Sequence, residues 1–390
     1  MMHRPRHSPL AAAAWWAVFA AGCVGTPPPS ALEARFDFPG VRVLQPQWRR
    51  LMIAPERREY RPLERSGVVF DPSRGLVFVG TSQGRFWALE SGSGEVVWAH
   101  DEPDGFHSAP LLVEDAGLVA AGNDGGDLLA FAPETGAVRW RAELGGPVRG
   151  EASYREGVLY VRTATQRVFA IEALSGRELW SFERPLPEGY VSGSEAGVLV
   201  SGDRVYAGFV DGTLTALSGV TGEKLWDINL ATEGHDELVL DDICATPVEV
   251  EGTLVVSSYD NGLFGIEASE GGQRWHRPEL THACGLAVLE QDVLVAVAGT
   301  GLARVDSTTG ATVWMRRYPA GTQRDPIVHR GLIVLADDIH GLLLFEALTG
   351  QVLQGAWAGA GVAGRPAVLD GRVAALDNSG ELLVYALAGG

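Results

Sequence analysis

After a short N-terminal stretch, the chain consists of short apolar runs that alternate with turn residues. The apolar run 205–208 is followed by Asp-Gly at 211–212, and the run 254–256 by Asn-Gly at 261–262. Such dipeptides between apolar runs are typical of tight β-hairpins, because both central residues of the turn tolerate a positive φ. No stretch after the first 22 residues has convincing helical periodicity. The pattern therefore predicts an all-β domain.

One sequence motif recurs along the chain. A small residue and an apolar residue, such as Ala88 and Leu89, are followed by a glycine and, four positions later, by a tryptophan. Successive tryptophans are 39 to 49 residues apart, which is the length of a four-stranded propeller blade. Six copies end in Trp98, Trp140, Trp180, Trp226, Trp275 and Trp314, and a seventh has Gln354 in the place of tryptophan. We interpret these tryptophans as apolar plates between adjacent blades and not as ligand platforms.

An eighth blade is split between the two ends of the chain. Residues 372–376 and 382–385 have the pattern of middle strands, but no tryptophan strand follows them. Residues 41–52 supply the missing strand, with Trp48 lying 50 residues before Trp98. The sequence therefore predicts one eight-bladed β-propeller of four-stranded antiparallel blades over residues 40–390. The N-terminal strand closes the last blade, so that the ring has no open edge.

The first 22 residues have the features of a targeting signal. Arg4 and Arg6 precede an apolar run of about a dozen residues, which is too short to span a bilayer comfortably. The small residues before Cys23 resemble a lipobox, which implies that Cys23 is acylated. Residues 23–39 then form a Pro-rich linker. An ordinary signal peptide, with Cys23 incidental, is the alternative. Val24 after the cysteine favours the periplasmic face of the outer membrane by analogy with enteric sorting.

The net charge limits the partners. It is −18 for the whole chain and −20 without residues 1–22, which contain two arginines and no acids. Such a domain repels nucleic-acid phosphates and anionic lipid headgroups. We therefore expect no nucleic-acid partner, membrane attachment through the lipid alone, and protein partners that are basic or neutral. A closed ring is expected to be monomeric.

The recurring motif that ends in tryptophan resembles the repeat of the PQQ-type propellers. Within that superfamily, the lipobox, linker and length resemble the BamB family, lipoproteins of the outer-membrane β-barrel assembly machinery. The most specific stretch is 241–250, Asp-Asp-Ile-Cys-Ala-Thr-Pro-Val-Glu-Val. Residues 189–194 lie where that family carries a loop that docks on BamA. The resemblance implies a non-catalytic scaffold that binds a BamA-like protein through Tyr190, Val191, Ser192, Asp241 and Asp242. Ser192 stands where an arginine is expected, and Cys244 where a second aspartate is expected.

Two other functions stay open at this point. The chain could be a periplasmic propeller for a different protein partner, or a quinone-binding propeller like the quinoprotein dehydrogenases. After the first 22 residues, the sequence has no adjacent cysteine pair, no long insertion and no His-x-x-x-His pair. We therefore expect no cofactor, no metal and no catalytic residues. A Gly-x-Ser-x-Gly match at 80–84 falls in a hairpin, which is not the strand-turn-helix elbow that such a nucleophile requires.

The repeat relates two cysteines. When Leu254 is aligned with Leu294, Cys244 and Cys284 fall at the same place in neighbouring blades, at the start of the innermost strand. We expect both to lie near the central channel, where they either form a disulfide or remain free thiols. The periplasm permits disulfides, and the Cα atoms would have to lie within about 7 Å of each other.

Overall fold

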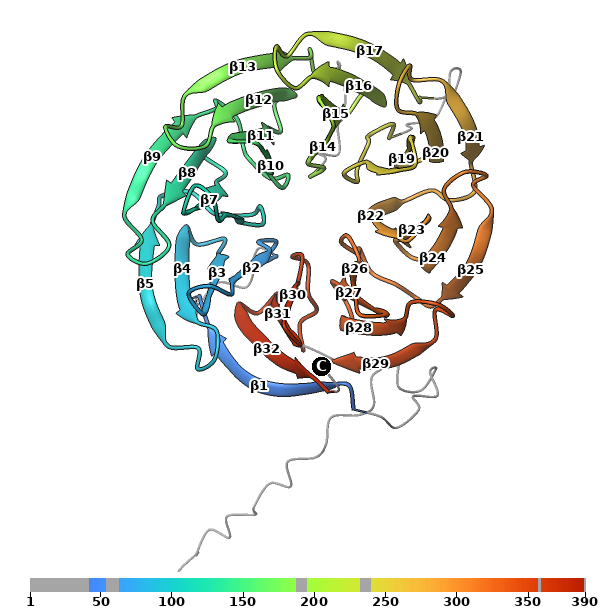
Figure 1. The fold of residues 1–390 in the computed structure, drawn as a ribbon. Helices are drawn as coiled ribbons and strands as arrows, with labels where there is room; N and C mark the ends of the chain where they lie inside the picture. Colours follow the sequence, from blue (N-terminus) through green and yellow to red (C-terminus); the bar gives the residue numbers. More distant parts are fainter. Residues whose placement is uncertain (1–41, 54–62, 187–194, 232–239, 357–358, 389–390) are drawn as a thin grey trace, which may run out of the picture.

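The computed structural model describes residues 42–53, 63–186, 195–231, 240–356 and 359–388. They form eight four-stranded sheets arranged as blades around a central axis (Figure 1). In each sheet the neighbouring strands are antiparallel, and consecutive strands run from the axis to the rim. The predicted eight-bladed propeller is confirmed.

The strands are assigned to blades in chain order. Blade 1 contains β2 (Val68–Asp71), β3 (Leu76–Gly80), β4 (Arg85–Glu90) and β5 (Val96–Asp101). Blade 2 contains β6 (Leu111–Val113), β7 (Leu118–Gly122), β8 (Asp127–Phe131) and β9 (Val138–Glu143). Blade 3 contains β10 (Ser153–Arg155), β11 (Val158–Arg162), β12 (Arg167–Glu172) and β13 (Glu178–Glu183). Blade 4 contains β14 (Val198–Ser201), β15 (Arg204–Gly208), β16 (Thr213–Ser218) and β17 (Lys224–Asn229).

The second half of the ring repeats this order. Blade 5 contains β18 (Val248–Val250), β19 (Thr253–Ser258), β20 (Gly262–Glu267) and β21 (Gln273–Arg277). Blade 6 contains β22 (Ala283–Leu289), β23 (Asp292–Val297), β24 (Gly301–Asp306) and β25 (Thr312–Arg317). Blade 7 contains β26 (Ile327–His329), β27 (Leu332–Asp337), β28 (Gly341–Glu346) and β29 (Val352–Ala356). Blade 8 contains β30 (Ala367–Leu369), β31 (Arg372–Leu376), β32 (Glu381–Leu387) and, from the other end of the chain, β1 (Leu44–Leu51).

Strand β1 closes the ring as the outer strand of blade 8. It pairs antiparallel with β32 from Leu44 opposite Leu387 to Leu51 opposite Glu381. The register shifts between Pro46 and Trp48, which leaves one extra residue as a bulge. The expectation that an N-terminal strand completes the last blade is confirmed.

Each blade tryptophan packs on a glycine of the following blade. Gly136 has φ +70°, and a Cβ atom there would lie 2.6 Å from the indole of Trp98. Only glycine therefore permits both the turn and the contact. The Trp98 indole N–H also donates to the Pro133 carbonyl oxygen at 2.7 Å. The same ring-on-glycine contact joins Trp48, Trp140, Trp180, Trp226, Trp275 and Trp314 to Gly94, Gly176, Gly222, Gly271, Gly310 and Gly350.

Gln354 has a different role at the seam between blades 7 and 8. Because β32 and β1 come from opposite ends of the chain, no glycine turn joins them. Instead, the Gln354 Oε1 atom accepts hydrogen bonds from the backbone N–H groups of Val43 and Leu44, each at 2.7 Å. Its Nε2 atom donates to the Leu44 carbonyl oxygen at 3.3 Å. The side chain thus holds the start of the closing strand.

The hydrophobic core lies between the blades. One cluster joins Val334 and Leu344 of blade 7 to Val373 and Tyr385 of blade 8, and equivalent clusters repeat around the ring. Among the residues with described positions, there is no helix that is long and apolar enough to cross a membrane.

Candidate functional site

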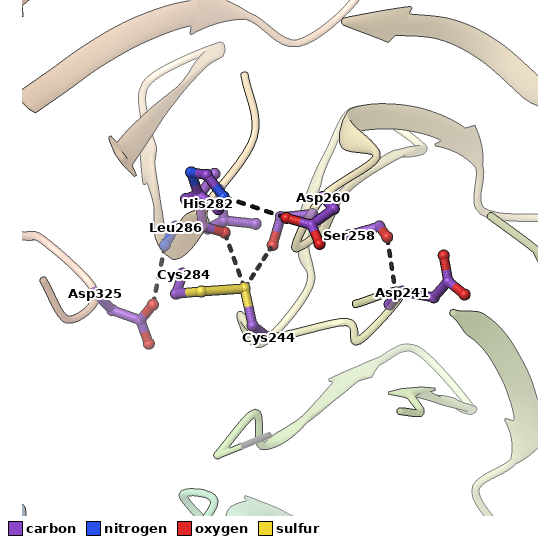
Figure 2. The surroundings of a disulfide bond; sticks show 10 residues. Asp241, Cys244, Ser258, Asp260, His282, Cys284, Leu286 and Asp325 are labelled. Carbon is purple, nitrogen blue, oxygen red and sulfur yellow. Dashed lines mark hydrogen bonds and ion pairs between the residues drawn. A yellow bond between two sulfur atoms is a disulfide. The ribbon is translucent and has the colours of Figure 1, made fainter. Parts of the chain in front are cut away.

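The predicted docking residues fall partly outside the described structure. The structure does not describe residues 187–194, which include Tyr190, Val191 and Ser192. It also does not describe Cys23, which lies in the N-terminal segment 1–41. Asp241 lies in the segment that leads into β18. Its Oδ1 atom accepts a hydrogen bond from the Asn261 Nδ2 atom at 2.8 Å. Its carbonyl oxygen accepts one from the Ser258 hydroxyl at 2.8 Å (Figure 2). Asp241 is therefore half-buried beside the β19–β20 turn.

Asp242 is not on the surface, contrary to the prediction. Its exposed fraction is 1%. Burial lowers the pKa of Arg162, in β11 of blade 3, to about 10, and the charge of Asp242 opposes this shift. Asp242 is thus an interior counter-charge for a buried arginine. In the sequence this residue resembles a surface acid, because its partner is 80 positions away.

The residues that support this segment are not among those predicted from the sequence. The Asp260 carboxylate accepts a hydrogen bond from the Leu240 N–H at 2.8 Å. It also lies 3.2 Å from the His282 Nε2 atom (Figure 2). His282 has φ +60° and donates its N–H to the Tyr259 carbonyl oxygen at 2.6 Å. Blades 5 and 6 together therefore hold the chain at 240–241. The turn at 261–262 is recognisable in the sequence, but the contact with His282 has no sequence signal.

Cys244 and Cys284 meet beside the central channel. The structure joins their sulfur atoms in a disulfide with the Cα atoms 5.1 Å apart, which is within the usual range (Figure 2). Cys284 is the second residue of β22, and Cys244 lies four residues before β18. The bond links blades 5 and 6 a few residues from Asp241, so it also limits movement of that segment.

Ion pairs cross the central channel between blades that are not adjacent. The Glu195 carboxylate, next to blade 4, pairs with both Arg65 and Arg324, which precede blades 1 and 7. Burial alone would raise the pKa of Glu195, but Arg324 and Arg65 hold it below the ordinary value. Arg365 pairs with Glu151 at 2.7 Å, which joins blade 8 to blade 3. These side chains leave a cavity of about 40 Å³.

Asp325 also lines this cavity. Its Oδ1 atom accepts the Leu286 N–H at 2.9 Å (Figure 2). Burial raises the pKa of Asp325 to about 6, although Arg365 opposes the shift. A second cavity of about 290 Å³ shares Asp325 and Arg365 with this one, and its walls include Val248 and Val288.

The space among these ion pairs is too small for the cofactor PQQ that the repeat implies. Small-molecule sites usually measure about 300 to 1,000 Å³; the space among the ion pairs is about 40 Å³, and the second cavity, at about 290 Å³, is at the lower limit of this range. Arg365, the arginine that lines the wider cavity, is already paired with Glu151. Within the described part of the chain, no three His, Cys, Asp or Glu side chains are grouped to hold a metal ion. Ser82 of the Gly-x-Ser-x-Gly match lies in the β3–β4 hairpin and donates to Glu64.

Comparison with known proteins gives a family match over most of the ring. The model of the family described as outer membrane protein assembly factor BamB matches residues 104–314 and 279–390. The protein of that name from Shewanella oneidensis is 25% identical over 333 residues, which cover 80% of this chain and 82% of the relative. The one from Nitrosomonas eutropha is 27% identical over 237 residues. This match covers 60% of the chain and only 57% of that relative's length.

Solved structures share the fold. BamB from Moraxella catarrhalis is 20% identical and superimposes with a TM-score of 0.73. The match covers 88% of this chain and 100% of the chain in that structure. At that identity the similarity shows the fold alone. Quinoprotein alcohol dehydrogenase PedH from Pseudomonas putida is 28% identical over 201 residues, which are 46% of this chain and 33% of that enzyme. The repeat is therefore also present in enzymes.

Proposed function

The chain belongs to the family of outer membrane protein assembly factor BamB, and from this premise we propose that it is a non-catalytic, lipid-anchored scaffold of the outer-membrane β-barrel assembly machinery. The observation that carries the proposal is the family match, which extends from residue 104 to residue 390. The partner in this proposal is a BamA-like outer-membrane protein. The closed ring acts as a monomer that presents its loops to this partner.

The filled channel supports a role without catalysis. Ion pairs across the channel leave a space of only about 40 Å³ among them. The test is the quinone and metal content of the protein purified from its own periplasm. A stoichiometric quinone that stays bound after purification would contradict this part of the proposal.

The anchor in this proposal is the lipid on Cys23, on the periplasmic face of the outer membrane. Cys23→Ala should block processing or release the protein in soluble form, because no acyl chain can then be attached. The measurement is membrane fractionation combined with the intact mass. A Cys23→Ala protein that matures normally and still sediments with the outer membrane would contradict the anchor.

The docking surface in this proposal combines Asp241 with the loop that contains Tyr190, Val191 and Ser192. Tyr190→Ala with Asp241→Lys should weaken capture of the barrel at least tenfold, because the pair removes an aromatic anchor and reverses a charge. Capture is measured by pull-down from solubilised envelopes, with the melting temperature as the check on folding.

Asp203→Lys is the matched control. Its side chain is 88% exposed in the β14–β15 turn, at the opposite end of the strands from Asp241. It reverses the same charge, so its capture should equal that of the wild type. Equal losses in both variants would mean that net charge, and not this surface, controls binding.

A further inference from the structure

The second cavity, of about 290 Å³, is polar at one end. Its charged residues and one threonine occupy a single repeat position, two residues before the innermost strand of a blade. They are Glu151, Thr246, Asp325 and Arg365, from blades 3, 5, 7 and 8. Because every blade begins with its innermost strand, these strands start at the same end of the ring (Figure 1). The four side chains therefore form one polar level of the channel.

The apolar walls of the cavity follow the same strands toward their hairpin turns. One to three residues beyond the polar level, the lining consists of Leu199, Val248, Ala287 and Val288. Three of these side chains are half-buried, and Val288 is 42% exposed, so they offer apolar surface to a ligand. The cavity has the volume of about ten water molecules. An unbranched chain of roughly six to ten heavy atoms would therefore fill it.

Asp325 lacks an ion pair at the polar level, as far as the described residues show. Arg365 is paired with Glu151 at 2.7 Å, whereas no cationic side chain of the described residues forms such a pair with Asp325. The Asp325 Oδ1 atom accepts the Leu286 N–H at 2.9 Å, and no described group donates to Oδ2 (Figure 2). Burial raises the pKa of Asp325 to about 6, so Arg365 compensates this carboxylate only in part.

Acidic side chains surround the other end of these strands. In the hairpin turns that follow β10, β18, β22 and β30, an exposed acidic residue has a φ of 46° to 57°. These residues are Glu156, Glu251, Glu290 and Asp370. Glycine and asparagine adopt such angles more readily than glutamate, so the turn geometry does not explain the carboxylates. The equivalent turn of blade 7 has Arg330. The four acids give this end a negative potential that attracts cations and repels anions.

We propose that the second cavity binds a primary ammonium group carried on an unbranched aliphatic chain. The ammonium donates to the Oδ2 atom of Asp325, and the chain lies against Val248 and Val288. A carboxylate at the same place would meet Asp325 and Glu151, with one guanidinium that is already paired. A free alkyl amine and the lysine side chain of a protein present the same group, and the test distinguishes them. The inference goes beyond the proposed function and does not depend on it.

Titration calorimetry of the mature full-length protein with butyl-, pentyl- and hexylammonium chloride tests the proposal. The titrations are run at about pH 7.5, where Asp325 is ionised. Affinity should rise about fourfold for each added methylene, as expected when one methylene is buried. Hexanoate should bind at least tenfold more weakly than hexylammonium, because the apolar chain is the same and the charge is reversed.

Asp325→Asn should weaken the binding of hexylammonium at least tenfold. The amide oxygen of asparagine still accepts the Leu286 N–H, so the fold should be retained, and the melting temperature checks this. Glu178→Gln, at the exposed start of β13, is the matched control. It removes the same charge from the outside of the ring and should leave the affinity unchanged. Val288→Ser, in the cavity wall, should reduce the gain in affinity with chain length.

A capped tripeptide with a central lysine identifies the source of the ammonium. Competition with hexylammonium assigns the site to a protein side chain, and its absence assigns the site to a free amine; both results keep the ammonium site. Four results would overturn the proposal: no binding of hexylammonium, equal affinity in Asp325→Asn, equal affinity for hexanoate, or an affinity that does not change with chain length. None of these depends on capture of the barrel, so this inference and the proposed function can fail separately.

Discussion

Replacement of Gln354 by leucine tests how the ring is closed. Leucine has a similar size but cannot accept the two hydrogen bonds from Val43 and Leu44 or donate the third. Leu44 is 2% exposed, so water does not readily replace these bonds. A net hydrogen bond contributes about 1 kcal/mol, and a buried N–H without a partner costs about 1–3 kcal/mol. We therefore expect Gln354→Leu to lower the stability of the seam by about 2–4 kcal/mol.

The assay is amide hydrogen exchange of β1 and β32, with urea unfolding as the global measure. A loss of 2–4 kcal/mol corresponds to roughly 30- to 900-fold faster opening. The increase should be confined to blade 8, because the other blades keep their own outer strands. Gln351→Leu, in the preceding exposed turn, is the matched control and should exchange as the wild type does. If β1 in Gln354→Leu exchanges at the wild-type rate, Gln354 does not hold the ring closed.

Three further predictions follow from the interior. Burial raises the pKa of Asp325 to about 6, so between pH 4 and pH 6 the folded state keeps a proton that the unfolded state releases. Over this range, unfolding titrations should show the wild type losing up to about 3 kcal/mol of stability relative to Asp325→Asn. Parallel stability curves for the two proteins would refute this. The mass of non-reduced, alkylated protein should show Cys244 and Cys284 unlabelled, and Cys244→Ser with Cys284→Ser should cost about 3–4 kcal/mol; two alkylated thiols would refute the bond. Asp242→Ala should cost about 3–5 kcal/mol in urea unfolding because it leaves the Arg162 charge uncompensated, and a loss below 1 kcal/mol would show that Asp242 is not its counter-charge.

The repeat makes the fold predictable from the sequence. Trp98 and its counterparts recur at blade spacing because every blade needs the same plate on the same glycine. The seam is predictable only in part. The exception at Gln354 is visible in the sequence, but its bonds to Val43 and Leu44 connect residues more than 300 positions apart.

The site is less predictable, because its contacts are between blades that are distant in the chain. Glu195 pairs with Arg65 and Arg324, about 130 positions away on either side. No local pattern marks these residues, since each looks like an ordinary charged residue in a loop. The same reason explains the wrong prediction for Asp242. Two adjacent aspartates look alike in the sequence, but only the structure shows that one faces the interior.

We propose that this ring is a protein-binding scaffold of the outer-membrane assembly machinery. The most direct measurement is quantitative mass spectrometry of what co-purifies with the tagged, lipidated protein from its native envelope after chemical cross-linking. We expect an outer-membrane β-barrel of the BamA type in near-stoichiometric amount, with cross-links to the segment around Asp241. Recovery of the protein with a bound quinone or with a soluble redox partner, and without such a barrel, would contradict it.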